Sequence, residues 1–147
     1  MLRRLVAIVG PTASGKTAIA VDLAHRLGVE IVNGDSRQIY LGMDIGTAKP
    51  GPAERRGIRH HLFDIVDPSE SYSLALYQRD ARATFDALWA KSSFPWLVGG
   101  TGQYIWSLLE NWSVPEVPPD ADLRGDLRSL AADDGPSSDE RRVGKEC

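Results

Sequence analysis

A glycine-rich segment near the start of the chain has the residue types needed to hold a phosphate group. It fits the pattern Gly-x-x-x-x-Gly-Lys-Ser/Thr at every fixed position and consists of Gly10, Pro11, Thr12, Ala13, Ser14, Gly15, Lys16 and Thr17. In such a P-loop, backbone N–H groups surround the phosphate, and the N-terminus of the following helix adds partial positive charge. The Lys16 ammonium adds a full charge, and the Thr17 hydroxyl can bind Mg²⁺. The segment therefore predicts a site for a nucleotide or a diphosphate.

The residues on either side predict the elements that position this loop. Residues 5–9 form an apolar, β-branched run typical of a buried strand in a parallel sheet. Residues 17–27 have the apolar spacing of a helix that ends at Gly28, and residues 29–33 predict a second strand. A strand, a helix and a strand joined by short connections favour an α/β fold. We therefore expect a P-loop NTPase-like parallel sheet flanked by helices.

The rest of the chain predicts further layers and then a change of composition. Strands are expected at residues 61–66 and 96–98, and helices at residues 73–91, 103–110 and 120–132, with mostly loop over residues 42–57. A proline-rich connector begins at residue 114. These features divide the chain into a P-loop core over residues 1–113, a connector and polar helix over 114–136, and a tail over 137–147.

The acid best placed to act on a ligand of the P-loop is Asp35. Proteins that hydrolyse a nucleotide usually end a second buried strand in an aspartate that orders Mg²⁺, whereas residues 96–98 are followed by Gly99 and Gly100. Asp35 follows the strand after the P-loop helix, and ligands of such sheets lie beyond the carboxyl ends of the strands. An ATP-dependent small-molecule kinase with Asp35 as base and a non-catalytic phosphate-binding fragment both fit this pattern.

Composition limits the compartment and the kind of partner. The formal net charge is −3, so a nucleic-acid contact has to come from a local patch. The densest basic cluster is a candidate for that patch, or an ordinary solvated surface, and contains Arg55, Arg56, Arg59, His60 and His61. The single cysteine, Cys147, and the lack of a long apolar run predict a cytoplasmic protein without a membrane segment.

Six segments in the same order resemble the tRNA dimethylallyltransferases, also called tRNA isopentenyltransferases. The resemblance covers about residues 3–132, and the segment at residues 35–50 makes it far more specific than the P-loop alone. The matching segments are Gly10–Thr17, Asp35–Tyr40, Asp44–Pro50, His60–Leu62, Asp67–Ser73 and Val98–Tyr104.

The resemblance implies a reaction and a role for each matching residue. The family transfers a dimethylallyl group from dimethylallyl diphosphate to N6 of an adenosine beside the anticodon of tRNA, with Mg²⁺, and we expect a monomer. The P-loop would then hold the diphosphate of the donor, with Mg²⁺ on Thr17. Asp35 would be the general base, and Thr101 would lie near the reacting centre. The tRNA contacts implied are Asp35, Ser36, Arg37, Gln38, Thr101 and Arg124.

Several of these residues also have a purely structural interpretation. Asp35 and Thr101 could each cap the turn or helix that follows. His60 and His61 are better explained by local hydrogen bonds than by a metal, because a Zn²⁺ site needs further ligands. The tyrosines at positions 40, 72 and 104 are expected at the edge of the core.

The sequence departs from the family in length. Members are about twice as long, with a helical insertion that grips the anticodon stem and further strands and basic residues. The resemblance therefore implies that residues 1–113 are an incomplete core and that residues 114–136 are the start of this insertion. Residues 137–147 match nothing expected of the fold, and they read as frameshifted DNA or as a disordered tail. We therefore expect this chain to lack part of the tRNA surface, to be poorly stable because sheet strands stay unpaired, and not to prenylate tRNA.

Overall fold

The computed structural model describes residues 3–115, 117 and 120–134. The chain divides into two units, Met1–Pro115 and Glu116–Cys147. The first unit contains the sheet and its helices. The described part of the second unit is one helix, α5 (Ala121–Asp134), whose leucines at positions 123, 127 and 130 are all exposed. The tail expected at residues 137–147 lies outside the described residues.

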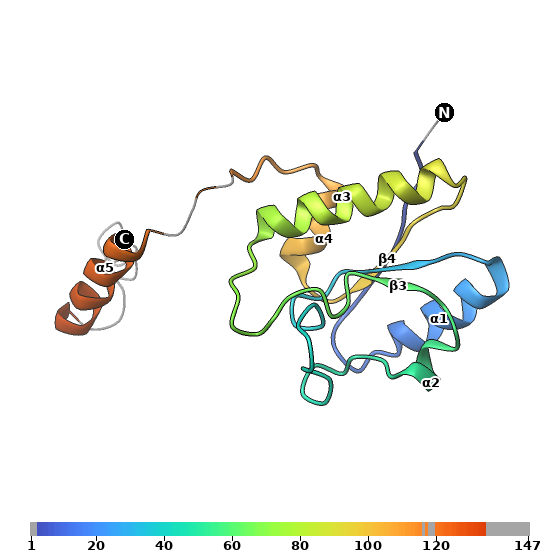
Figure 1. Cartoon of the computed structure of the whole chain (residues 1–147), viewed down its shortest axis with the longest axis horizontal. Coiled ribbons are helices and arrows are strands. Elements are labelled where there is room, and N and C mark those ends of the chain that lie inside the picture. Colours follow the sequence, from blue (N-terminus) through green and yellow to red (C-terminus); the bar gives the residue numbers. More distant parts are fainter. Residues whose placement is uncertain (1–2, 116, 118–119, 135–147) are drawn as a thin grey trace, which may run out of the picture. The chain divides into compact units, whose positions relative to one another are not determined.

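The first unit is a parallel α/β sheet, which confirms the predicted fold class (Figure 1). The strands are β1 (Val6–Val9), β2 (Ile31–Asn33), β3 (His60–His61) and β4 (Trp96–Gly99), and their order in the sheet is β1-β4-β2-β3. The helices are α1 (Lys16–Leu27), α2 (Pro52–Arg55), α3 (Leu74–Ala90) and α4 (Gly102–Leu109). None of the described helices is long and apolar enough to cross a membrane.

Two apolar layers cover opposite faces of the sheet because successive strand residues point to opposite sides. On one face, Ile31 and Val98 pack with the buried side of α1, which is Ala20, Val21 and Ala24. On the other face, Val32 and Leu97 pack with α3 and α4. The predicted stripe of α3 is confirmed, since its buried apolar side chains include Tyr77, Ala81, Phe85 and Leu88. β2 and β4 are buried at every position, as expected for strands whose two faces are both covered.

Two local expectations were wrong. The strand expected over residues 61–66 is reduced to β3 and a single bridge between Tyr40 and Val66. Leu62 and Asp64 have positive φ angles of 62° and 55°, and this left-handed backbone interrupts an extended strand. Helical spacing also places Leu27 on one apolar face with Ala20, Leu23 and Ala24. Leu27 is nevertheless 60% exposed, because the buried face of α1 is formed by smaller residues earlier in the helix.

The strand that leads into the P-loop lies at an edge of the described sheet. β1 pairs with β4 and, among the described residues, has no strand on its other side. The prediction that this strand is buried was wrong, since Val6 and Val9 are 38% and 54% exposed. Strands of parallel sheets are usually buried, so an exposed edge strand of this kind is unusual.

The carboxyl ends of β2 and β4 approach each other closely at a pair of glycines. The Gly34 amide donates to the carbonyl of Val98 at 2.8 Å, and the amide of Thr101 donates to the carbonyl of Gly34 at 3.2 Å. A Cβ atom on Gly99 would lie only 2.2 Å from the carbonyl carbon and oxygen of Gly34. Because the neighbouring atoms are backbone, a side chain here can be accommodated only by moving the strands apart.

We therefore expect Gly99→Ala to destabilise the chain by about 3 kcal/mol, at the upper end of the usual cost of overpacking. Urea unfolding followed by tryptophan fluorescence measures the effect. Gly46→Ala is the matched control, because a Cβ at Gly46 meets nothing within 4 Å, and we expect a change of at most about 0.5 kcal/mol. Equal stabilities of the two variants would show that the glycine contact is not needed.

Candidate phosphate and acceptor site

The P-loop connects β1 to α1, as expected for a phosphate site at the N-terminus of a helix. Gly15 precedes the helix with a φ angle of 79°, a left-handed conformation that glycine adopts without steric cost. The Lys16 ammonium donates a hydrogen bond of 2.7 Å to the carbonyl oxygen of Pro11, so its charge lies over the loop itself. Thr17 lines the cavity beside the loop.

The two carboxylate oxygens of Asp35 have different roles: one stabilises a local turn and the other faces the site. Oδ1 accepts a 2.9 Å hydrogen bond from the amide of Arg37, which closes a local turn. The amide of Asp35 donates to the side chain of buried Asn33 at 2.9 Å, and the Asn33 side-chain amide donates to the carbonyls of Asp35 and Leu62. The backbone at Asp35 is thereby fixed from the end of β2, and the turn-forming interpretation applies to one oxygen of the carboxylate.

The hydroxyl of Thr101 links α4 to the segment that carries Asp35. Thr101 is at the N-cap position of α4, but its side chain makes no capping hydrogen bond. Its Oγ1 instead accepts a 2.9 Å hydrogen bond from the amide of Ser36 and lies 3.2 Å from the Ser36 hydroxyl oxygen. The structure thus brings together two predicted site residues that are 65 positions apart in the chain.

Lys16 and Asp35 converge above Gly100. A Cβ atom at this glycine would lie 3.7 Å from Lys16 Nζ and 3.8 Å from Asp35 Oδ2. The second oxygen of the Asp35 carboxylate therefore faces the same space as the P-loop lysine. A glycine at this position leaves that space open to a ligand.

Two cavities meet at Asp35. The first, of about 250 Å³, is lined by the P-loop and α1 residues 12–18 together with Asp35, Gln38 and Thr47. The second, of about 270 Å³, is lined by Thr12, Asp35, Ser36, Arg37, Gly46, Thr47, Gly100 and Thr101. Asp35, Thr12 and Thr47 line both. A group held by the P-loop and a second molecule in the other cavity could therefore approach Asp35 from two sides.

The segment between β2 and α2 is held over these cavities by a buried lysine. The Lys49 side chain is only 2% exposed, and its ammonium contacts Asp44 at 2.9 Å and Asp64 at 2.6 Å. It also donates to the carbonyl of Tyr40 at 2.6 Å. Burial acts to lower the pKa of Lys49, but its hydrogen bonds to Asp64 and Asp44 outweigh burial and leave the pKa raised. Lys49 is therefore charged and ties both ends of the segment to the core.

The side chain of Gln38 also positions this segment. Its amide nitrogen donates to the carbonyl oxygens of Thr47 and Ala48 at 3.0 and 3.2 Å. Thr47, which lines both cavities, is thus placed by Gln38. The sequence analysis missed Thr47, Lys49 and Asn33; the only signal for the first two was their place in the segment at residues 44–50.

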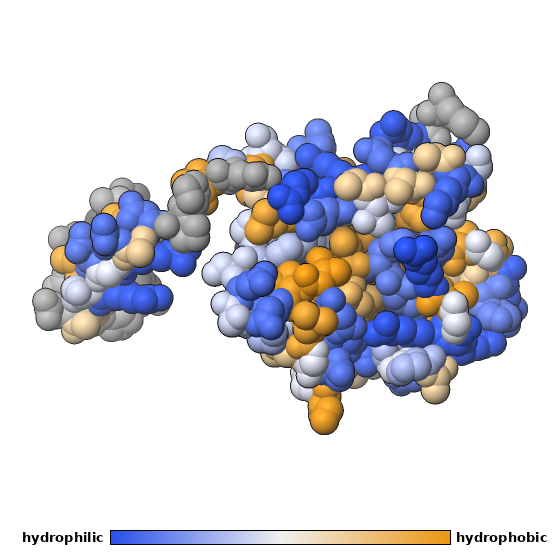
Figure 2. Space-filling model, viewed as in Figure 1, coloured by the Kyte–Doolittle hydropathy of each residue, from blue (hydrophilic) through white to orange (hydrophobic). Residues whose placement is uncertain are grey.

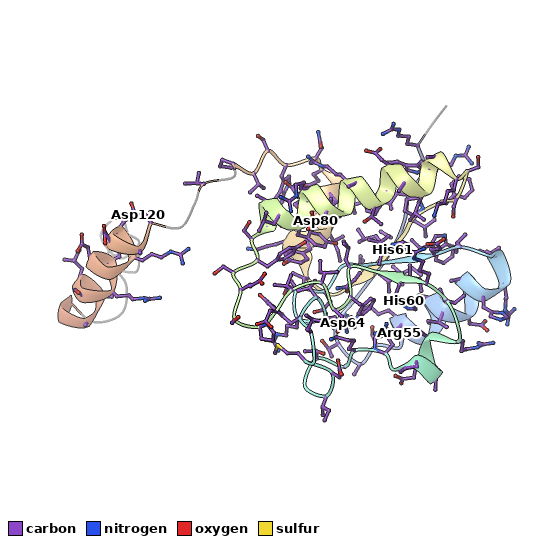
Figure 3. All side chains as sticks on the ribbon, viewed as in Figure 1. Arg55, His60, His61, Asp64, Asp80 and Asp120 are labelled. Atoms are coloured by element: carbon purple, nitrogen blue, oxygen red, sulfur yellow. The ribbon has the colours of Figure 1, made fainter. Side chains whose placement is uncertain are left out.

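The basic cluster is paired with acidic and backbone groups of the protein. Figure 3 labels Arg55, His60 and His61 of this cluster, together with Asp64. Arg55 lies 3.7 Å from Asp64 and above the ring of Phe63, and Arg56 lies 3.3 Å from Asp22. His61 contacts Glu30, whereas His60 bonds the carbonyl of Ile58 and burial lowers its pKa. These contacts support local structural roles for the two histidines, and the described residues hold no cluster of metal-ligating side chains.

The family follows from two overlapping matches. A family model described as IPP transferase matches residues 38–143, and one described as isopentenyl transferase matches residues 3–66. The first match alone spans more than half of the chain. The chain belongs to the IPP transferase family.

Curated relatives and solved structures of this family agree. The chain is 55% identical over 131 residues to the tRNA dimethylallyltransferase of Roseiflexus sp., a match that covers 89% of this chain and 43% of the relative. A tRNA isopentenylpyrophosphate transferase structure from Bacillus halodurans is 45% identical with a TM-score of 0.75, covering 91% of this chain and 44% of that one. A eukaryotic dimethylallyltransferase acting on tRNA is 30% identical with a TM-score of 0.74, covering 87% and 33%. The chain thus spans less than half the length of the relatives it matches.

The predicted site residues of this IPP transferase chain lie in two places. Thr12–Thr17 of the P-loop line one or both of the two cavities, together with Asp35, Ser36, Arg37, Gln38 and Thr101, whereas Gly10 and Pro11 line neither. Arg124 lies on α5 in the second unit, where its side chain is exposed. Its role in tRNA binding stays a prediction.

Proposed function

We propose that this chain carries the donor and acceptor site of an enzyme that transfers a dimethylallyl group from dimethylallyl diphosphate to N6 of an adenosine beside the anticodon of tRNA. The observation that supports this proposal most strongly is that Asp35 lines two cavities at once. One cavity has the P-loop and suits a diphosphate. The other has the hydroxyls of Ser36 and Thr101 and the cation of Arg37, which suit a base and its phosphate.

The chemistry of the proposed transfer needs a base and a charged site for the leaving group. The exocyclic N6 of adenine attacks C1 of the dimethylallyl group, the C1–O bond breaks, and its electron pair leaves with the diphosphate. Asp35 accepts the proton that N6 loses. A positioned general base of this kind raises the reaction rate by about 10²- to 10⁴-fold. Lys16 and the P-loop amides stabilise the charge on the diphosphate.

Mg²⁺ fits the residues beside the P-loop. This ion keeps several waters and commonly takes few protein ligands together with phosphate oxygens. Thr17 would supply its hydroxyl, consistent with the lack of a multi-acid cluster among the described residues. Bound there, Mg²⁺ would neutralise part of the diphosphate charge.

The acceptor adenine has to leave its stack to reach Asp35. Proteins commonly recognise single-stranded loops of RNA through bases that are splayed out, and turning one out costs a few kcal/mol. Thr101 and Ser36 are joined by hydrogen bonds, so both hydroxyls have a fixed place beside Asp35. In this proposal the two hydroxyls position the adenine. Other parts of the enzyme bind the stem of the tRNA, in the cytoplasm.

The experiment that tests the function offers two donors to two proteins. One is the 147-residue chain, and the other is a chimera in which its matched region is followed by the rest of the Roseiflexus relative. Each is incubated with tRNA, Mg²⁺ and either dimethylallyl diphosphate or ATP. We expect the chimera to consume dimethylallyl diphosphate and prenylate tRNA. We expect the shorter chain not to do so, since β1 has a partner strand on only one side among the described residues. Consumption of ATP alone would favour the kinase alternative.

A further inference from the structure

A hydrophobic tip projects from the loop between β2 and α2. We call this group the apolar tip: Leu41, Met43 and Ile45, which are 47%, 42% and 99% exposed. Figure 2 shows a hydrophobic projection at the bottom of the view, where Figure 1 places this loop. A fully exposed isoleucine gains nothing from folding, since none of its apolar surface is removed from water.

The apolar tip is held in place by specific contacts. The Thr47 hydroxyl donates to the carbonyl of Met43 at 2.5 Å, and Lys49 bonds both Asp44 and the carbonyl of Tyr40. Gln38 bonds the backbone at residues 47 and 48 on the far side of the tip. The buried ammonium and its partners thus fix the loop on both sides of Ile45 while leaving the side chain of Ile45 uncovered.

The tip adjoins the cavity that Asp35 shares with Thr101. Arg37, Gly46 and Thr47 line that cavity and also an open hollow of about 440 Å³ around Met43 and Ile45. Arg37 is exposed and places a cation between the two. The Asp35 cavity therefore adjoins an apolar side chain and a positive charge, the two kinds of group that an unstacked base and its phosphate require.

We propose that Ile45 is a wedge that packs against a base next to the target adenine and keeps the anticodon loop open while the adenine lies at Asp35. The proposal rests on the proposed function, since it takes tRNA as the acceptor. Apolar side chains inserted between bases are an established way to unstack a nucleic acid, and the exposed face of a base is apolar enough to bury one. The bracing by Lys49 fits this role because a wedge has to hold its position against stacking.

The test uses the 147-residue chain and an anticodon stem-loop RNA with 2-aminopurine at the target position, whose fluorescence rises when the base leaves its stack. Ile45→Ser is compared with the parent chain, with Ile45→Leu, and with Phe94→Ser. Phe94 is the matched control because it is 48% exposed and precedes β4, at the amino ends of the parallel strands, whereas Asp35 follows the carboxyl end of β2. Anisotropy gives the affinity, and the fluorescence at saturation gives the fraction of opened base.

We expect Ile45→Ser to bind the RNA about 10-fold more weakly, as loss of one buried apolar side chain implies, and to lose most of the fluorescence rise. Ile45→Leu and Phe94→Ser should behave like the parent. If the parent opens the base and Ile45→Ser opens it equally, the wedge is overturned and the proposed function stands. If the parent binds this RNA but leaves the base stacked, the wedge fails while the proposed function stands. If the chimera described above also neither binds nor opens this RNA, the choice of tRNA as acceptor fails and the wedge fails with it.

Discussion

Replacing Lys16 with alanine is expected to lower prenyl transfer by the chimera about 10²- to 10³-fold, the usual cost of losing one preorganised donor at a developing charge. The Lys16 ammonium lies over the P-loop, 2.7 Å from the carbonyl of Pro11, and faces the space above Gly100 that it shares with Asp35. Without it, the negative charge of the leaving diphosphate is met by amide dipoles alone. The rate of tRNA prenylation at saturating substrate measures the effect.

Lys91→Ala is the matched control, since Lys91 is an exposed lysine at the end of α3, away from the P-loop. It should transfer at the parental rate. The affinity of the 147-residue chain for inorganic diphosphate gives a second measurement that does not require turnover, and Lys16→Ala should weaken it. A Lys16→Ala chimera with nearly normal turnover would contradict the role assigned to this residue.

The second large effect is expected for Asp35→Asn in the chimera. Asparagine keeps a side-chain oxygen that can accept from the amide of Arg37, so the turn at Asp35 should survive. It cannot accept the proton that N6 loses. We therefore expect turnover to fall by about 10²-fold or more while tRNA affinity stays nearly unchanged. Single-turnover kinetics and tRNA binding, measured side by side, separate the two quantities.

Asp67→Asn is a close control for the structural part of this change. Asp67 Oδ1 accepts from the amide of Ser69 at 2.9 Å, the same local turn that Asp35 forms with Arg37. Its hydrogen bonds to Ser69 lower the pKa of Asp67, as expected for a carboxylate in such a turn. Asp67→Asn should leave turnover unchanged. If Asp35→Asn instead abolishes tRNA binding with the chemical step intact, Asp35 is a residue that binds the base or forms the turn.

Features that depend on residues close together in the sequence could be predicted from the sequence alone. The P-loop is defined by a short spacing of glycines and a lysine, and the apolar runs on either side define β1 and α1. The stripe of α3 follows from helical periodicity in the same way. The parallel α/β class follows because short strand–helix–strand connections have few ways to pack. Asp35 was singled out because it directly follows a strand.

Only the tertiary structure decided which distant residues meet. The link from Thr101 to Ser36 and the contact of Lys49 with Asp64 join residues that no local pattern connects. Strand length was also decided by tertiary context, since the residues after β3 adopt a left-handed backbone and the expected strand stops there. Burial was decided in the same way: Ile45 and Val32 look alike as apolar side chains, but one is fully exposed and the other fully buried. Local spacing encodes elements, whereas the contacts that build the site depend on how those elements pack, and packing is a property of the whole chain.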